Sequence, residues 1–170
     1  MSDPRYDEIL GGIRQSYKHS CILWMEEITN PAIEEEYKKQ KDTLIRLRGE
    51  DTVQELSLYH GTGENVANVI AEKGFDPTLN RTSMYGRGTY FAKNASYSKN
   101  YAPPSKGDEI SFMLICSVLV GKMSVYGINK AIDTTIHDNS VDVLKNPEIY
   151  VTPYQYGAIP RYLVAFYKGV

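Results

Sequence analysis

Two short stretches hold residues whose types and spacing suit the binding of a flat, polar ligand. Residues 58–62 read Leu-Tyr-His-Gly-Thr, a short strand that ends in a histidine and a glycine turn. Residues 86–101 hold glycines, aromatic rings and hydroxyls more densely than a core strand needs. Glycine lets a ligand approach the backbone closely, and tyrosine offers a flat apolar face with a polar tip. Together the two stretches indicate a binding site.

Taken singly, these residues have simpler explanations. A lone histidine on a strand is more often a packing residue than a ligand contact, and Tyr90 or Tyr101 alone is typical of a protein core. The chain has 14 tyrosines among 170 residues, so most of them are expected to serve packing. It is the joint spacing that favours a site.

The ordered set of residues resembles a known family. The box Tyr-His-Gly-Thr at residues 59–62, then Gly-Arg-Gly-Thr-Tyr-Phe-Ala at residues 86–92 with Ser98 and Tyr101 behind it, is similar to the catalytic domain of the poly(ADP-ribose) polymerase family, in its mono-ADP-ribosyltransferase branch. The resemblance extends through residues 141–166 and, more weakly, back to about Asn30. A His-Gly-Thr tripeptide alone is a weak signal, whereas the ordered set is specific.

The resemblance implies that NAD is the co-substrate, with no metal. Gly61 would bind the carboxamide of NAD through its backbone and Ser98 through its hydroxyl, while Tyr90 and Tyr101 would enclose the nicotinamide ring. His60 would hydrogen-bond the adenosine ribose as a clamp and not as a base. Residues 75–85, turn formers without a period, would be the donor loop over NAD. The implied NAD-binding set is His60, Gly61, Thr62, Arg81, Tyr90, Ser98 and Tyr101.

The third catalytic position of the family decides the product. Polymerising members carry a glutamate there, which activates the growing chain. Aligning residues 160–163 with the closing strand of the family, without a gap, puts Ile149 at this position and gives the catalytic triad His60, Tyr90 and Ile149. Glu148 is the rival. Because neighbours on a strand face opposite sides, only one of the two can face the cleft, and Ile149 is preferred.

The chemistry that NAD demands supports this reading. Breaking the bond between nicotinamide and ribose builds positive charge on the sugar, so the protein must hold the ring, orient the ribose and exclude water. The leading hypothesis is an NAD-dependent protein ADP-ribosyltransferase, a pentosyl-transferring glycosyltransferase that moves one ADP-ribose to a Glu, Asp or Cys side chain and releases nicotinamide. The alternatives are a catalytically weak NAD-binding scaffold module and the ADP-ribosylation of nucleic-acid ends.

Composition narrows the partners and the setting. Lys+Arg 19 against Asp+Glu 21 gives a net charge of −2, so nucleic acid is not the expected partner. The resemblance implies NAD and an acceptor protein, the chain itself included, as partners. Cys21 and Cys116 lie far apart without a Cys-x-x-Cys motif, which argues against zinc and a disulfide framework, and Cys116 is expected to be buried. No apolar stretch reaches the roughly 20 residues of a membrane span, and residues 1–5 do not resemble a signal peptide. An intracellular setting, cytoplasmic or nuclear, is expected.

An apolar fraction of 42% in 170 residues predicts one globular domain over residues 1–170, with residues 1–50 as its N-terminal strand and helix. Strands are expected at residues 20–28, 53–60, 88–92, 109–120, 148–152 and 162–167. Elements mixed without a regular βαβ alternation predict an α+β fold. The resemblance implies the ADP-ribosyltransferase fold, two packed, mostly antiparallel sheets around an NAD cleft with flanking helices.

Three helices frame these strands. Asn30 predicts the start of the first and Gly49 its end, with Ile33, Tyr37, Leu44 and Leu47 on its apolar face and i,i+4 pairs from Glu34 to Lys38 and from Glu35 to Lys39. The second follows a glycine turn at residues 61–63, carries Val66, Val69 and Ile70 on one face and stops at Gly74. The third covers residues 95–101. Gly11 and Gly12 are expected to interrupt any helix over residues 6–17.

Overall fold

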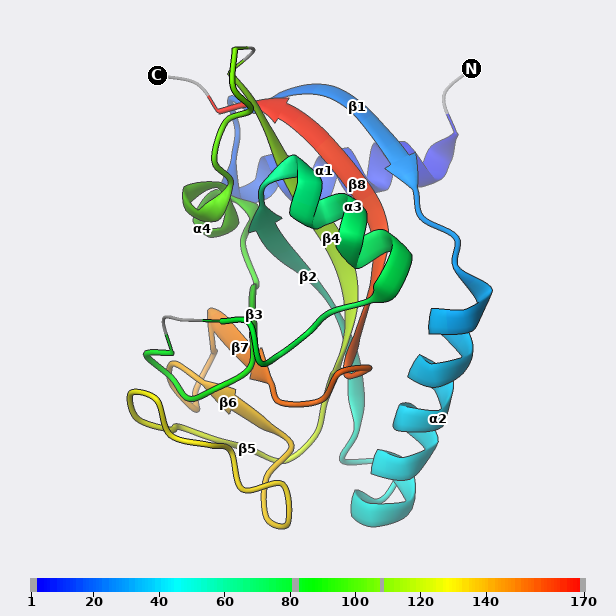
Figure 1. Ribbon diagram of the computed structural model, residues 1–170, viewed down its shortest axis with the longest axis vertical. Helices are drawn as coiled ribbons and strands as arrows, with labels where there is room; N and C mark the ends of the chain where they lie inside the picture. Colours follow the sequence, from blue (N-terminus) through cyan, green and yellow to red (C-terminus); the bar gives the residue numbers. More distant parts are fainter. Residues whose placement is uncertain (1–2, 81–82, 108, 169–170) are drawn as a thin grey trace.

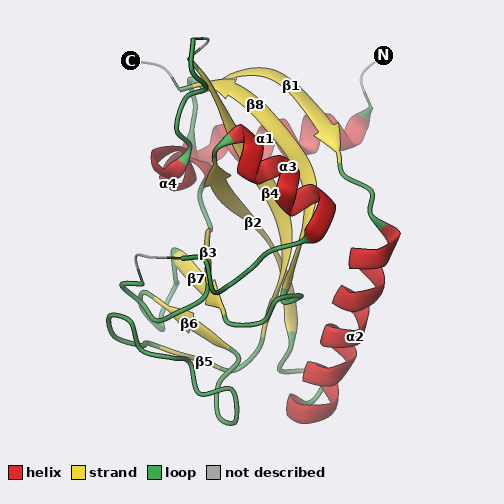
Figure 2. Ribbon diagram, in the orientation of Figure 1, coloured by secondary structure: helices red, strands yellow, loops and turns green. Residues whose placement is uncertain are grey.

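The computed structural model describes residues 3–80, 83–107 and 109–168. Figures 1 and 2 show helices on both sides of a twisted sheet. In chain order the elements are α1 (Pro4–Ser16), β1 (Cys21–Glu27), α2 (Pro31–Arg48), β2 (Gln54–Thr62), α3 (Glu64–Lys73), β3 (Thr89–Ala92), α4 (Ala95–Ser98), the 3₁₀ turn η1 (Lys99–Tyr101), β4 (Ile110–Val120), β5 (Met123–Ser124), β6 (Asn139–Val141), β7 (Ile149–Thr152) and β8 (Ala158–Tyr167).

The strands form one sheet in the order β1-β8-β4-β2-β3-β7-β6-β5, antiparallel except for the parallel pair β5–β6. The sheet has two halves. The long half holds β1, β8, β4 and β2, and the short half holds β3, β7, β6 and β5. In the described part of the chain, one residue pair, Tyr59 with Ala92, joins β2 to β3. The α+β class is confirmed, and the two expected sheets are continuous through this bridge.

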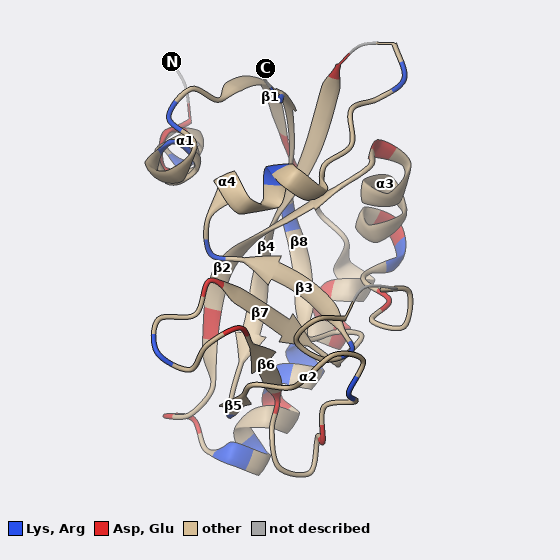
Figure 3. Ribbon diagram, turned by 90° about the vertical axis from the view of Figure 1, so that its left-hand side faces the viewer, with Lys and Arg blue, Asp and Glu red and all other residues tan. Residues whose placement is uncertain are grey.

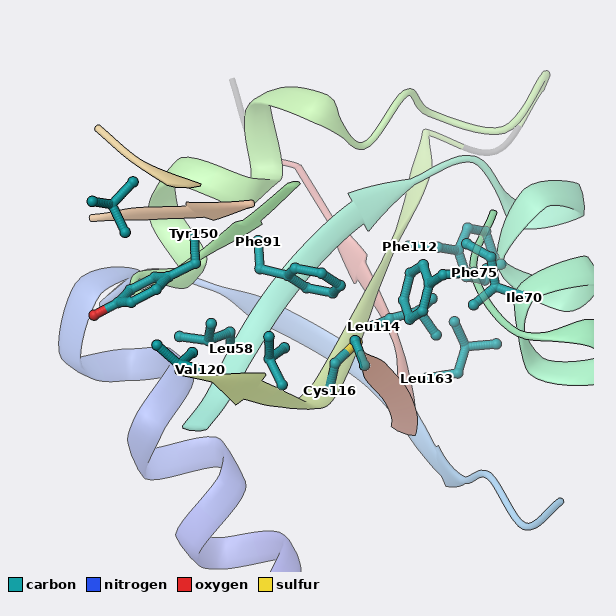
Figure 4. Close-up of a cluster of buried hydrophobic side chains, with 14 of the residues drawn as sticks. Leu58, Ile70, Phe75, Phe91, Phe112, Leu114, Cys116, Val120, Tyr150 and Leu163 are labelled. Atoms are coloured by element: carbon teal, nitrogen blue, oxygen red, sulfur yellow. The ribbon is translucent and has the colours of Figure 1, made fainter. Parts of the chain in front are cut away.

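The long half is covered on both faces. Leu114 faces α3, where it shares a buried cluster with Ala67 and Ile70. Its strand neighbours Met113 and Ile115 point the opposite way, as strand alternation requires, and pack with α1 and α4. In Figure 1, α3 crosses in front of the sheet and α1 runs behind it. Burial on both faces explains why β4 is an almost continuous apolar run, and Figure 4 shows the cluster on the α3 face.

The helix α2 has the predicted ends. The side chain of Asn30 accepts a hydrogen bond from the N–H of Ile33, and Gly49 takes a positive φ of 88° just after the last turn. On its face, Ile33, Tyr37 and Leu44 are buried against β4 and β8. Leu47, predicted to be buried, is 64% exposed.

The predicted ion pairs of α2 are half right. Lys39 pairs with Glu35 at 3.2 Å. Glu34 pairs with Arg161 of β8 at 2.5 Å, and not with Lys38 as predicted. The guanidinium of Arg161 is held in place by a second bond to the hydroxyl of Ser117, so it offers Glu34 a fixed partner that a flexible lysine cannot match.

The prediction that glycines interrupt the first helix is wrong. α1 runs through both Gly11 and Gly12. A Cβ at Gly12 would lie 3.1 Å from the hydroxyl of Tyr59, so the glycine permits a close approach of α1 to the sheet. Ile13, 1% exposed, anchors the same turn, and Asp3 caps the helix. Tertiary packing therefore offsets the low helix propensity of glycine, which costs about 1 kcal/mol per residue relative to alanine.

Two short strands of the short half, β5 and β6, were not predicted from the sequence. β5 has two half-buried residues, and two of the three buried residues of β6, Asn139 and Ser140, are polar. Asn139 of β6 is 1% exposed and donates to the carbonyls of Leu119 and Val151, while it accepts from the N–H of Gly121. β8 is also longer than predicted, since it passes through Pro160 at an irregularity in its pairing with β4. Among the described residues, the helices are too short or too polar to cross a lipid bilayer.

Candidate active site

A cleft of about 700 Å³ opens where the two halves of the sheet meet. Because β2 and β3 pair at one position, the strands separate beyond it and leave room between α3, β3 and the α4–η1 segment. A second groove, of about 610 Å³, lies between the start of α2 and β8 and contains no residue of the predicted site. The cleft at the junction is therefore the candidate active site.

The structure brings most of the predicted site residues together. The residues of that set which line the cleft are His60, Gly61, Tyr90, Ser98, Tyr101 and Ile149. Thr62 does not line it. β2 continues through Thr62 instead of turning at Gly61, so Thr62 is buried opposite Phe112 of β4. Arg81 lies outside the described residues.

His60 is held at the end of β2 in one tautomer. Its Nδ1 lies 2.7 Å from the carbonyl oxygen of Tyr90, and because a carbonyl can only accept, Nδ1 carries the proton. The ring centroids of Phe75 and Phe91 lie 5.2 and 5.5 Å from the centroid of the imidazole ring. Burial lowers the pKa of His60 from its ordinary value of 6.5, although the bond to Tyr90 acts in the opposite direction. The neutral ring leaves Nε2 as a hydrogen-bond acceptor.

Gly61 is required by the packing of the protein itself. A Cβ at this position would lie well inside 3.0 Å of the carbonyl oxygen of Ser98, which real Cβ atoms do not tolerate. The α4–η1 segment therefore rests directly on the backbone of β2. At the same residue, the edge of β2 is no longer paired with β3, so its backbone borders the cleft. Glycine serves both the packing and the open edge.

The hydroxyl of Tyr90 holds the loop that precedes β3. It accepts a hydrogen bond from the N–H of Tyr85 at 2.8 Å and donates one to the carbonyl of Gly86 at 2.7 Å. Gly86 itself adopts a φ of 92°, a conformation that favours glycine. Tyr90 thus does two things at once, since its side chain lines the cleft and its hydroxyl fixes the loop beside the cleft.

A pair of tyrosines forms the wall on the α4–η1 side. Tyr97 and Tyr101 have ring centroids 5.5 Å apart at 37°, and their hydroxyl oxygens lie 3.1 Å apart. The hydrogen bond with Tyr101 and partial burial raise the pKa of Tyr97 to about 12. Tyr101 is 61% exposed, whereas Ser98, between the two, is 3% exposed. The wall therefore presents one exposed aromatic ring, that of Tyr101, and one buried hydroxyl, that of Ser98.

Ile149 and Glu148 face different surroundings. Ile149 pairs with Ala92 across β3 and β7, is 4% exposed and lines the cleft. The carboxylate of Glu148 accepts a hydrogen bond from the side-chain amide of Asn94 at 2.9 Å, away from the lining residues. Asp142 accepts the backbone N–H of both residues and fixes the start of β7. The cleft therefore meets an apolar side chain at this point.

The apolar wall of the cleft was not predicted from the sequence. Val66 and Val69 were predicted to share one face of α3 with Ile70, and all three line the cleft, where the two valines are 52% and 50% exposed. Leu79 and Met84, 74% and 57% exposed, continue this wall. The signal was present in α3, because a core-facing stripe through Ala67 and Ile70 leaves the two valines on the helix flank.

Comparisons with known proteins identify the family of the chain. Residues 6–152 match the model of the poly(ADP-ribose) polymerase catalytic domain family. The chain is 31% identical to human "Protein mono-ADP-ribosyltransferase PARP14", over 98% of this chain and 10% of that protein. It is 29% identical to mouse "Protein mono-ADP-ribosyltransferase PARP12", over 97% of this chain and 24% of that protein. The chain thus spans between a tenth and a quarter of these two relatives.

The fold has a solved counterpart as well. The crystal structure of the PARP domain of Arabidopsis RADICAL-INDUCED CELL DEATH1 superposes with a TM-score of 0.78, covers 98% of each chain and shares 20% sequence identity. At that identity the likeness establishes the fold. The family match, which covers most of the chain, establishes more: this chain belongs to the poly(ADP-ribose) polymerase catalytic domain family.

Proposed function

We propose that the cleft binds NAD and that the chain transfers a single ADP-ribose unit from NAD to a protein side chain, with release of nicotinamide. One observation supports the proposal. The residues that follow the order of the family motif in the sequence line one cleft: His60, Gly61, Tyr90, Ser98 and Tyr101. Its volume of about 700 Å³ is in the usual range for sites that bind small ligands and cofactors. Residues 1–170 act in this proposal as one catalytic domain.

The nicotinamide end is proposed to lie beside the α4–η1 segment. The open backbone edge at Gly61 offers hydrogen-bonding groups to the carboxamide, and Ser98 adds a hydroxyl. Tyr101 supplies an exposed ring face for stacking on the nicotinamide, with Tyr90 on the other side. Flat faces and a carboxamide clamp orient the ring without any acid or base.

His60 is proposed to hold the adenosine ribose. Because its Nδ1 proton is already bound to the carbonyl of Tyr90, Nε2 can accept a hydrogen bond from a ribose hydroxyl. The lowered pKa keeps the ring neutral at physiological pH, so this acceptor is not lost to protonation. The residue acts as a clamp. The apolar wall of α3 then provides a surface for the flat adenine base.

The reaction breaks the bond between the anomeric carbon of the ribose and the ring nitrogen of nicotinamide. The electron pair of that bond passes to the nitrogen, so nicotinamide leaves as a neutral amide. An acceptor oxygen or sulfur then donates its own pair to the anomeric carbon. Gly61, Ser98, Tyr90 and Tyr101 contribute by fixing the leaving group. The loop residues Leu79, Met84 and Tyr85, which line the cleft, limit attack by water.

The apolar side chain of Ile149 limits the product to one unit. Chain elongation requires a ribose hydroxyl to be polarised at the anomeric carbon, and general-base help of that kind is typically worth about 10²–10⁴ in rate. Ile149 offers neither a charge nor an acceptor, and the carboxylate of Glu148 is bound to Asn94. An acidic acceptor side chain brings its own carboxylate, so a first transfer does not need this help.

The test is to incubate the chain with NAD and to measure released nicotinamide together with the mass of the modified chain. We expect nicotinamide release and a gain of one ADP-ribose mass per modified side chain. Glu148→Gln should leave the product unchanged, and Ile149→Glu should not yield efficient polymer because it restores only the carboxylate. A ladder of long chains that Glu148→Gln abolishes would overturn the assignment of Ile149.

Two other outcomes separate the alternatives. NAD binding without nicotinamide release would support the scaffold module and overturn the transferase. Modification of an added oligonucleotide end, with no modified protein, would support transfer to nucleic acid. The mixed charges disfavour the latter, since basic and acidic residues are interspersed on the side of the molecule where β3, β7 and α4 face the viewer (Figure 3).

A further inference from the structure

We propose that Tyr97 is a positioning residue, which holds the ring of Tyr101 in the orientation that stacks on the nicotinamide. This inference rests on the proposed function and deepens it, because it adds to the ligand-facing residues one that acts through another. Tyr97 is absent from the residues that sequence analysis singled out. It lines the same cleft as Tyr101, one helical turn before it.

The two rings are coupled directly. Their hydroxyl oxygens lie 3.1 Å apart, at hydrogen-bond distance, and their ring centroids lie 5.5 Å apart at 37°. The pair therefore has contacts at two points, one between the ring faces and one between the tips. A ring held at both points cannot rotate about its side-chain bonds without breaking one of them.

Tyr101 needs such a partner. It ends a 3₁₀ turn of three residues, and 61% of it is exposed. An exposed side chain on a short turn samples several rotamers, and a ligand that selects one of them loses affinity to the ordering. A hydrogen bond that already selects the stacking rotamer removes that loss.

Tyr97 is a suitable anchor because its own helix is fixed. Ala95, two residues before it, is fully buried in the cluster between α1 and the sheet. The N–H of Ser96 donates a hydrogen bond to the hydroxyl of Ser16 at the end of α1. Tyr97 is also less exposed than Tyr101, 38% against 61%. The pair thus joins an anchored residue to one at the free end of the segment.

The hydroxyl of Tyr97 keeps its proton at physiological pH. The hydrogen bond with Tyr101, burial and the negative charge of Asp142 raise the pKa of Tyr97 to about 12. One of the two hydroxyls can therefore always donate to the other. The coupling does not depend on pH in the range where the protein works.

A double-mutant cycle tests this inference, with benzamide as the probe because it reproduces the ring and carboxamide of nicotinamide. The variants are Tyr97→Phe, Tyr101→Phe and the pair together, each measured by calorimetry. We expect each single change to weaken benzamide binding roughly two- to tenfold, the range that one hydrogen bond gives. The double variant should bind no more weakly than Tyr101→Phe alone, because the shared bond is lost only once.

Tyr167→Phe, at a tyrosine of β8 outside the cleft, is the control and should leave affinity unchanged. Melting temperatures separate a positioning role from a structural one, since Tyr97→Phe should lower the affinity for benzamide and leave the melting temperature nearly unchanged. Wild-type affinity in Tyr97→Phe, or strictly additive losses in the double variant, would overturn the inference alone. Failure of the wild-type chain to bind benzamide would overturn both this inference and the proposed function.

Discussion

The two halves of the sheet are stabilised in different ways. In the long half, β2, β4 and β8 have 9, 11 and 10 residues, and β4 and β8 are buried along most of their length, with helices packed on both faces of β4. In the short half, β3, β7, β6 and β5 have 4, 4, 3 and 2 residues, and β6 buries polar side chains. The long half is thus stabilised mainly by apolar burial, whereas the short half combines a smaller apolar cluster with hydrogen bonds of buried polar side chains.

Asp138 shows how the short half is held. Its side chain is fully buried and accepts hydrogen bonds from the guanidinium of Arg48, the N–H of Lys122 and the hydroxyl of Tyr154. These contacts join the last turn of α2 to the loops around β5 and β6. The cleft is lined by His60 and Gly61 of the long half and by Tyr90 and Ile149 of the short half.

The largest expected effect is on the core of the long half. Leu114→Ala removes a side chain with no exposed surface at the centre of β4 and should lower the free energy of unfolding by about 2–5 kcal/mol. Urea denaturation followed by circular dichroism measures it. Leu144→Ala, at a leucine that is 59% exposed in the short half, is the control and should stay within about 0.5 kcal/mol. Equal losses in the two variants would show that Leu114 is not part of the packed core of the long half.

The next effect falls on the contact between β2 and the α4–η1 segment. In Gly61→Ala, the new methyl group displaces the backbone of Ser98, so benzamide affinity should fall roughly a hundredfold, as expected for a shift of about 1 Å in a binding site. Gly63→Ala is the matched control, because its Cβ meets Pro103 at 3.6 Å, an ordinary contact. If Gly61→Ala binds as well as Gly63→Ala, the cleft does not hold the ligand at this edge.

A smaller effect is expected for the loop that Tyr90 holds. Tyr90→Phe keeps the ring but removes two hydrogen bonds, each worth roughly 0.5–1.5 kcal/mol, so the loop at Tyr85 and Gly86 should open more often. Hydrogen exchange at the Tyr85 amide should accelerate, while exchange at Leu114 should not change. Unaltered exchange at Tyr85 would show that the hydroxyl does not hold the loop.

The smallest effect concerns pH. The folded-state pKa of His60 lies below its ordinary value of 6.5, so its contribution to stability is complete above pH 6.5 and is lost as pH falls from there through the folded pKa. The slope cannot exceed about 1.4 kcal/mol per pH unit for one group. Melting temperatures of wild type and His60→Gln should converge as pH falls below 6.5. A gap between wild type and His60→Gln that stays constant from pH 7 to below pH 6.5 would refute the linkage.

The long half could be predicted from the sequence because its signals are local. The apolar run of β4, the cap at Asn30 and the stop at Gly49 each act within a few residues. The course of α1 through Gly12 could not be predicted, since it depends on Tyr59, far along the chain. β6 escaped for the same reason: Asn139 is satisfied by partners from β4 and β7, and no local pattern shows that.

The candidate site was predictable where a motif orders several residues at once. His60, Gly61, Tyr90, Ser98 and Tyr101 were chosen by spacing, and all of them line the cleft. Thr62 belongs to the same motif, yet it does not line the cleft, because the strand continues past the expected turn. Residues outside motifs, such as Val66 and Val69 of α3, can be assigned to the cleft only once the position of the helix over the sheet is known.

The structure of the chain with a non-hydrolysable NAD analogue bound tests the central claim most directly. We expect the analogue in the cleft between the two halves, with its carboxamide about 3 Å from the backbone of Gly61 and its nicotinamide ring against Tyr101. An analogue in the groove between α2 and β8, beside Asn30 and Arg161, would contradict it. So would an analogue in the cleft whose adenine, and not its nicotinamide, lies against Tyr101.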